Sequence, residues 1–198
     1  MFELAREAFV CACATDVPDE NPPTDATSTG TLRFRLAGAD ELARLADHDA
    51  AALAMMRADL ARGDRWLVGE LDGAIVTYTF LSLARSFAYP ALPGCAFSLR
   101  ADVGYGHGAW TPPALRGRGY RRRAFVEELR WLRTNDKKWE ASVFIAPQLD
   151  PARRSLGGAG IVVEPLWRVE YGRDRRLAVE RLTAADDDRC VPITSYNG

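Results

Sequence analysis

Residues 111–123 read TPPALRGRGYRRR, and this stretch decides the fold. Two prolines stop a strand, Arg116-Gly117-Arg118-Gly119 forms a turn, and an amphipathic helix follows. Glycines let the backbone approach a ligand closely, and the first free N–H groups of a helix form an anion site together with its dipole. Arginine adds a charge-assisted and bidentate grip on phosphate. The segment is therefore predicted to hold a phosphorylated ligand such as a cofactor.

Hydrophobic patterning on either side predicts an α/β (α+β) fold, with a mixed, mostly antiparallel central sheet and flanking helices. Strand patterns alternate with two main helical stretches at 40–62 and 118–134. Asp72-Gly73 is typical of a hairpin turn, and Asp150-Pro151 is typical of the start of a short helix. The strands are expected at residues 31–36, 66–71, 74–83, 95–110 (one long strand or two), 139–145, 161–171 and 177–182.

The chain is expected to divide into three regions: an N-terminal arm and linker at 1–30, a compact domain at 31–183 and a C-terminal tail at 184–198. Residues 8–14 are apolar, but Glu3 and Glu7 stand where a secretory signal is basic. A short N-terminal helix is therefore predicted there.

Composition narrows the function classes. The chain has 198 residues and a net charge of −1, so the molecule as a whole is not built to bind a polyanion. Its four cysteines contain no CxxC pair, and with only two histidines the spacing does not fit a zinc site. No apolar run approaches the length of a membrane span. We expect a cytoplasmic protein with reduced thiols, no metal, no membrane contact and no nucleic-acid partner.

The order of elements around the turn resembles the GCN5-related N-acetyltransferases (GNAT fold). Arg116 and Gly119 fit the family's Arg/Gln-x-x-Gly-x-Gly/Ala turn, and Pro113 stands where the family commonly has proline. The later strand, short helix and Gly160-Ile161 are similar to a further family segment. The resemblance covers roughly residues 32–182, which is nearly the whole compact domain.

Two positions depart from the family's pattern. Arg121 stands where the family prefers Gly or Ala, so the pyrophosphate loop is expected to differ in shape. Leu156 falls where a catalytic tyrosine often sits, and Leu149 or Asp150 replaces the usual asparagine. The identity of the general acid is left open by these changes.

The resemblance implies acyl transfer from an acyl-CoA, usually acetyl-CoA, to an amine by direct attack in a ternary complex. A small-molecule acceptor is favoured, and the oligomeric state is left open, with a homodimer as one alternative. Which of the last three arginines of the loop meets the 3′-phosphate is also open. The implied cofactor loop is Thr111, Arg116, Gly117, Arg118, Gly119, Tyr120, Arg121, Arg122 and Arg123.

The catalytic candidates are His107, Tyr105 and Ser155. In a strand at 104–108, Tyr105 and His107 project to one face, and the three glycines at 104, 106 and 108 leave the other face bare for a ligand or another backbone. Related acetyltransferases place a base on this strand, and histidine is suited to take the ammonium proton, directly or through water. Tyr105 or Ser155 is the candidate proton donor to the thiolate. The structural alternatives are a packed histidine and a core tyrosine.

Three other functions stay open at this point. The enzyme could transfer a longer acyl chain, with the apolar residues 89–99 lining a tunnel and the arginine cluster meeting an acidic carrier protein. The chain could also be a non-catalytic acyl-CoA-binding module. Binding of nucleic acid through the arginine cluster is the third, and it predicts a steep salt dependence.

Overall fold

The computed structural model describes residues 5–13, 30–45, 48–88, 95–145, 153–154, 156–157, 161–171, 177–182, 184 and 186–194. The chain forms two compact units. The first unit contains Met1–Val17, Leu83–Tyr105 and Leu129–Gly198, and the second contains Pro18–Ser82 and Gly106–Glu128. Strand β7 (Val103–Trp110) and helix α2 (Tyr120–Thr134) each pass from one unit into the other along the chain.

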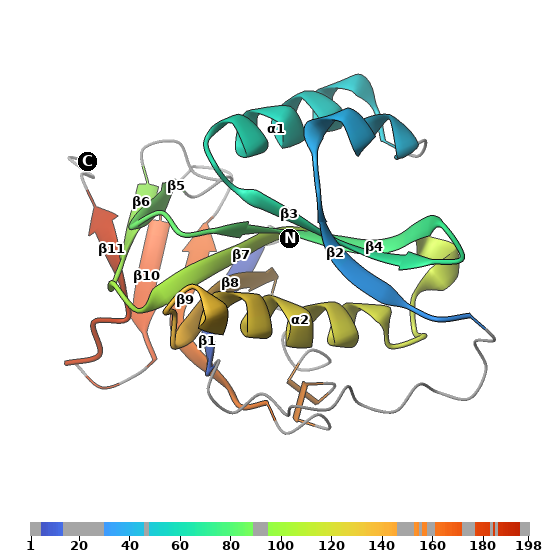
Figure 1. Cartoon of the computed structure of the whole chain (residues 1–198). Helices are drawn as coiled ribbons and strands as arrows, with labels where there is room; N and C mark the ends of the chain where they lie inside the picture. The colour runs from blue at the N-terminus through green and yellow to red at the C-terminus, as the bar shows by residue number, and fades with distance from the viewer. Residues whose placement is uncertain are drawn as a thin grey trace, which may run out of the picture. The chain divides into compact units, whose positions relative to one another are not determined.

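The second unit is a small antiparallel sheet with a helix on each face. Strands β2 (Arg33–Ala37), β3 (Arg65–Leu71) and β4 (Ala74–Ser82) pair antiparallel, and the later part of β7 follows beside β4. Helix α1 (Ala50–Ala61) covers one face of β3 and β4, and the start of α2 lies on the other (Figure 1). The described residues of this unit also contain two short 3-10 helices, η2 (Ala39–Arg44) and η3 (Pro113–Leu115).

Local sequence explains where these elements begin and end. The side chain of Asp49 caps α1 by accepting the Ala52 N–H at 2.7 Å, and Gly63 with φ +99° follows the end of the helix. Asp72 (φ +51°) and Gly73 (φ +80°) form the turn between β3 and β4, as two positive φ angles in a two-residue hairpin require. The predicted hairpin is confirmed.

The core of the second unit lies between α1 and the sheet. Trp66, Tyr78 and Phe80 pack there against aliphatic side chains of η2 and α1. Three aromatic rings from two adjacent strands contribute to this cluster, and such rings dominate the energetics of a core. On the same unit, Tyr120 at the start of α2 packs with Leu32 in a second, smaller cluster.

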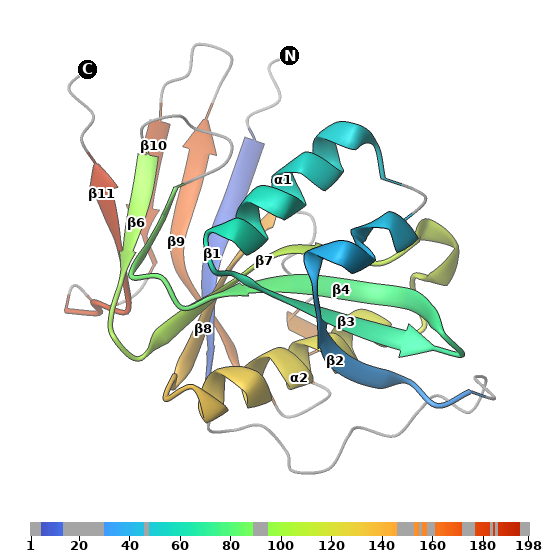
Figure 2. The same cartoon turned by 45° about the horizontal axis from the view of Figure 1, so that its top comes forward.

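The first unit holds the remaining strands in two sheets. Strand β1 (Ala5–Cys13) pairs antiparallel with β8 (Trp139–Ile145) on one side and with β9 (Val163–Tyr171) on the other, as Figure 2 lets the reader follow. Strand β10 (Leu177–Arg181) follows β9. A second sheet has the order β11-β6-β5, with its strands at Ser86–Ala88 (β5), Cys95–Leu99 (β6) and Cys190–Thr194 (β11).

The helix predicted at residues 8–14 is wrong, because residues 8–13 belong to β1. Its partners β8 and β9 follow more than a hundred residues later, and local propensity does not reveal such a pairing. Strands β5 and β11 were not predicted, and of the two alternatives for the stretch 95–110 the structure has two strands. Most of the linker and the loop at 89–94 lie outside the described residues. The domain boundaries at 30 and 183 stay predictions.

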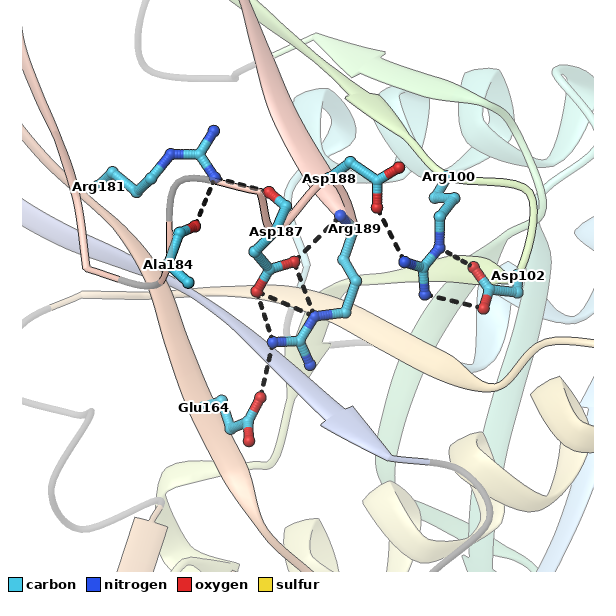
Figure 3. Close-up of polar contacts among 8 residues, drawn as sticks. All are labelled: Arg100, Asp102, Glu164, Arg181, Ala184, Asp187, Asp188 and Arg189. Atoms are coloured by element: carbon cyan, nitrogen blue, oxygen red, sulfur yellow. Dashed lines mark hydrogen bonds and ion pairs between the residues drawn. The ribbon is translucent and has the colours of Figure 1, made fainter.

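A network of ion pairs stabilises the turn that precedes β11 (Figure 3). It joins Arg100 to Asp102 and Asp188, and Arg189 to Glu164 and Asp187. The Arg189 guanidinium also lies 4.3 Å from the ring centroid of Trp139. The tail predicted at 184–198 therefore contains a strand that is anchored in the first unit.

Gly104 on β7 is required by packing. A Cβ added there would lie 2.3 Å from Leu132 Cδ2, and Leu132 on α2 is fully buried. Gly104→Ala is therefore expected to destabilise the protein by roughly 1–3 kcal/mol, the usual cost of overpacking a tight core. Urea unfolding measures this, with Gly117→Ala as a contrasting variant whose cost comes from its positive φ and not from a clash. A Gly104→Ala protein as stable as wild type would contradict the prediction.

No helix in the described part of the chain is long and apolar enough to cross a membrane.

Candidate active site

The turn before α2 has the geometry that the sequence predicts. Gly117 has φ +78° and Gly119 has φ +77°, and both angles are readily available only to glycine. A Cβ added at Gly117 would meet no atom within 4 Å, so this part of the turn is open. The Arg123 N–H donates to the Gly119 carbonyl at 3.1 Å in the first turn of α2. The N–H groups of the residues just before Arg123 have no acceptor within the helix, and they lie at the positive end of the helix dipole.

Arginine side chains surround this turn in different ways. Arg116 and Arg118 are exposed, and the Arg116 Nε–H donates to the Thr111 carbonyl at 3.2 Å. Arg122 and Arg123 are half-buried, and their Nε atoms are buried without a hydrogen-bond partner among the described residues. Tyr120 is buried and anchors the start of α2 in the core. Four arginines of the predicted loop thus lie around one helix start.

Arg121 differs from these four because its guanidinium pairs with Glu128 two turns further along α2. Glu128 is completely buried, and the second of the two contacts, from Arg121 Nη2 to Glu128 Oε2, measures 3.2 Å. The same guanidinium lies 5.4 Å from the ring centroid of Phe125. Any contact of Arg121 with a phosphate would compete with this pair, so its predicted binding role stays a prediction.

His107 lies in the second unit, on the part of β7 that lies beside β4 in the sheet. Its Nε2 lies 3.1 Å from Oδ2 of Asp64, which is the residue immediately before β3. Its ring stacks on Phe80 with centroids 5.6 Å apart, and its carbonyl accepts a hydrogen bond from Thr79 Oγ1 at 3.2 Å. Asp64 and Phe80 therefore contact the imidazole ring, and Thr79 holds the backbone of the same residue.

Asp64 stays ionised although it is buried. Burial of the Asp64 carboxyl raises its pKa, but hydrogen bonds from His107 and Ser82 oppose this effect and leave the pKa below its ordinary value. Arg62 also contributes, with its Nη2 at 3.9 Å from Asp64 Oδ2. The site therefore presents a carboxylate to the imidazole at neutral pH.

The other catalytic candidates are placed differently. Tyr105 belongs to the first unit, where its ring stacks on Phe87 with centroids 3.8 Å apart. Ser155 lies outside the described residues, and Leu156 is buried. Tyr105 and Ser155 thus stay predictions as proton donors.

The idea that the glycines bare one strand face for a ligand is wrong at Gly104, whose empty side is filled by Leu132. Gly108 has φ +60°, so glycine is needed there for backbone conformation.

Residues on and near α1 differ in how far they are exposed. Met56 is part of the core, whereas Met55 is exposed. His48 is half-buried, with Nε2 at 2.6 Å from the Tyr78 hydroxyl and its ring edge against Trp110. Burial raises the pKa of Tyr78 to about 12, so this hydroxyl keeps its proton. His48 is therefore a packed polar group.

Sequence reasoning missed Asp64. This residue follows Gly63 at the end of α1 and precedes a buried strand, a context that is typical of an ordinary loop aspartate. It lies 43 positions from its partner His107, and no local pattern links the two. Only the pairing of β3, β4 and β7 brings them together.

Comparison with known proteins establishes the fold. No family model and no curated protein matches the sequence. Forty-seven chains of solved structures match. One is the GCN5-related glucosamine N-acetyltransferase region of a fungal multi-domain GH3 beta-N-acetylglucosaminidase, at 14% identity and a TM-score of 0.56, covering 90% of this chain and 21% of that one. Another is the aminoglycoside N-acetyltransferase AAC(6')-Iy in complex with CoA, at 16% identity and a TM-score of 0.50, covering 68% of this chain and 90% of that one.

The chain thus has the fold of the GNAT acetyltransferases, and the predicted fold class is confirmed. It spans about a fifth of the fungal enzyme's length.

Proposed function

We propose that this protein is an acyl-CoA-dependent N-acyltransferase, which transfers an acetyl group from acetyl-CoA to an amine of a small molecule by direct attack in a ternary complex. The observation that carries the proposal is the open turn with two left-handed glycines at the start of α2, surrounded by arginines. Such a helix start binds anions through its N–H groups and dipole.

The donor set of this turn fits the pyrophosphate of coenzyme A. The backbone N–H groups at 117–122 would hold the phosphate oxygens, and the exposed guanidinium groups of Arg116 and Arg118 would add charge-assisted hydrogen bonds. The open space at Gly117 allows the close approach that such binding needs. When bound, acyl-CoA supplies an activated acyl group, a thioester whose carbonyl carbon an amine can attack while the thiol leaves.

His107 is the proposed general base, because an amine must lose its ammonium proton before it can attack. The His107 imidazole is hydrogen-bonded to the ionised carboxylate of Asp64, and this contact suits the imidazole to accept a proton. A covalent route through Cys190 is disfavoured, since burial, together with Asp187, raises the pKa of that thiol to about 12. Tyr105 and Ser155 stay the proposed alternatives for the general acid.

An amino sugar is the acceptor class that we propose first. The two reported neighbours are a glucosamine N-acetyltransferase region and an aminoglycoside N-acetyltransferase, and both names describe amines on a sugar ring. A small-molecule acceptor also agrees with the near-zero net charge of the chain. Action in the cytoplasm and without a metal is part of the proposal.

Calorimetric titration with acetyl-CoA and desulfo-CoA tests the cofactor site. Arg118→Glu/Gly119→Asp places two negative charges where the phosphates would lie, so binding is expected to fall by at least a hundredfold (roughly 3 kcal/mol for two repelled charges). Arg33→Glu, an exposed charge reversal on β2, is the matched control and should bind like wild type. Wild-type protein that binds neither ligand would sink the acetyl-CoA proposal, and longer acyl-CoAs would be titrated next.

A non-catalytic acyl-CoA-binding module is the second candidate, favoured by the buried Leu156 where a catalytic tyrosine often sits. It predicts binding of acetyl-CoA without turnover on any amine of a broad panel. Transfer of longer acyl groups is separated from both by a series of acyl-CoA chain lengths, for which the acetyl donor should be the best substrate.

A further inference from the structure

We propose that Asp64 is a positioning residue for His107. Its carboxylate holds the imidazole in the tautomer with the proton on Nε2, and Nδ1 is therefore the nitrogen that takes the proton from the amine substrate. The second half of this proposal rests on the proposed acyltransferase function, whereas the first half concerns the protein alone.

The contact between the two side chains is specific to one ring nitrogen. Nε2, and not Nδ1, lies 3.1 Å from Asp64 Oδ2. A carboxylate has only acceptor capacity, so the hydrogen of this bond must come from the ring. In a neutral imidazole one nitrogen is a donor and the other an acceptor, so an Nε2–H bond assigns the acceptor role to Nδ1.

The environment fixes this arrangement from both sides. On the carboxylate side, Asp64 is 7% exposed and also accepts a hydrogen bond from Ser82. On the imidazole side, the ring of Phe80 stacks against one face of His107. Arg62 is the nearby cation, but its side chain is 63% exposed and its Nη2 lies 3.9 Å from Asp64 Oδ2. It therefore does not replace the shorter contact between Asp64 and His107. A buried carboxylate acts through low dielectric and is therefore a strong orienting group.

The proton step balances within these groups. An N–H bond of the acceptor's ammonium breaks, and its proton forms a bond with Nδ1 of His107, directly or through one water. Nε2 keeps its own proton, so the positive charge moves from the ammonium to an imidazolium that faces the Asp64 carboxylate. The released electron pair stays on the amine nitrogen, which becomes able to attack.

Nitrogen NMR tests the tautomer without any enzymatic assay. The chain has two histidines, so a protein labelled with ¹⁵N-histidine gives two imidazole patterns, and His48→Gln assigns them. Wild-type His107 is expected to carry its proton on Nε2. Asp64→Asn presents an amide that can accept from Nε2–H through its oxygen or donate to a bare Nε2 through its NH2 group, so a mixture of tautomers is expected. Asp72→Asn removes the same charge from an exposed turn of the same unit and should leave the wild-type pattern.

Kinetics test the consequence for catalysis. Asp64→Asn is expected to lower kcat by about tenfold to a hundredfold, as loss of a histidine's carboxylate partner does at other sites, while KM for acetyl-CoA stays the same. Asp64→Glu keeps a carboxylate and should recover part of the loss. Urea unfolding of each variant separates these effects from lost stability.

Two results would overturn the inference: a wild-type His107 protonated on Nδ1, or an Asp64→Asn protein whose tautomer and kcat both match wild type. If no amine is turned over but the tautomer depends on Asp64, the proposed function fails while the orienting role stands. The two failures are therefore distinguishable.

Discussion

Replacing His107 with glutamine is expected to lower kcat for N-acetylation by roughly a hundredfold to ten-thousandfold, the range that a general base contributes. The glutamine amide can still donate to Asp64 Oδ2, so the variant keeps the polar contact that holds this part of β7. It cannot accept a proton at neutral pH. The loss should therefore appear in kcat, and calorimetry should show wild-type affinity for acetyl-CoA.

The pH dependence of the His107→Gln variant provides the matching control. Without a base, attack depends on the fraction of the amine that is already neutral in solution. The variant's rate should then rise with pH until the acceptor's own pKa is reached, and the difference from wild type should shrink. A His107→Gln protein that turns over like wild type at pH 7 would show that the base lies elsewhere. A protein that binds acetyl-CoA and never turns over, with or without His107, would support the non-catalytic module.

The features that could be predicted from sequence are those that depend on neighbours in the chain. The glycines of the turn, the Asp72-Gly73 hairpin and the start of α2 each need residue types at fixed short spacing, and all three are confirmed. His107 was predicted as the base because it lies on the strand that precedes the turn, where related acetyltransferases place a base. These features also position the proposed cofactor site.

The features that were missed depend on contacts between distant segments. Asp64 has no signature of its own, because its role arises only from the strand pairing that brings it to His107. The strand nature of residues 5–13 depends on two partners far along the chain. Arg121 and Glu128 are an intermediate case: a spacing of seven places both on one face of a helix, but burial of the glutamate is a property of the packed helix.

Replacing Arg121 with methionine is expected to destabilise the protein by about 3 kcal/mol, because the change leaves the Glu128 carboxylate buried without its partner. Glu128 is 0% exposed and Arg121 34% exposed, so the cost falls mainly on the glutamate, and the lower end of the usual range applies. Urea unfolding measures the difference. Arg118→Met, an exposed arginine at the same turn, should change stability by no more than about 0.5 kcal/mol.

The double variant Arg121→Met/Glu128→Leu separates the ion pair from the position of the side chains. Removing both charges takes away the uncompensated carboxylate, so most of the lost stability should return, as it does when apolar residues replace a buried pair. If the double variant is as unstable as Arg121→Met, the pair is not the cause. The affinity of the double variant for acetyl-CoA tests whether Arg121 also binds the cofactor. Wild-type affinity would mean that Arg121, which stands where the family prefers Gly or Ala, only stabilises the helix. Weaker binding would mean that it also contacts a phosphate.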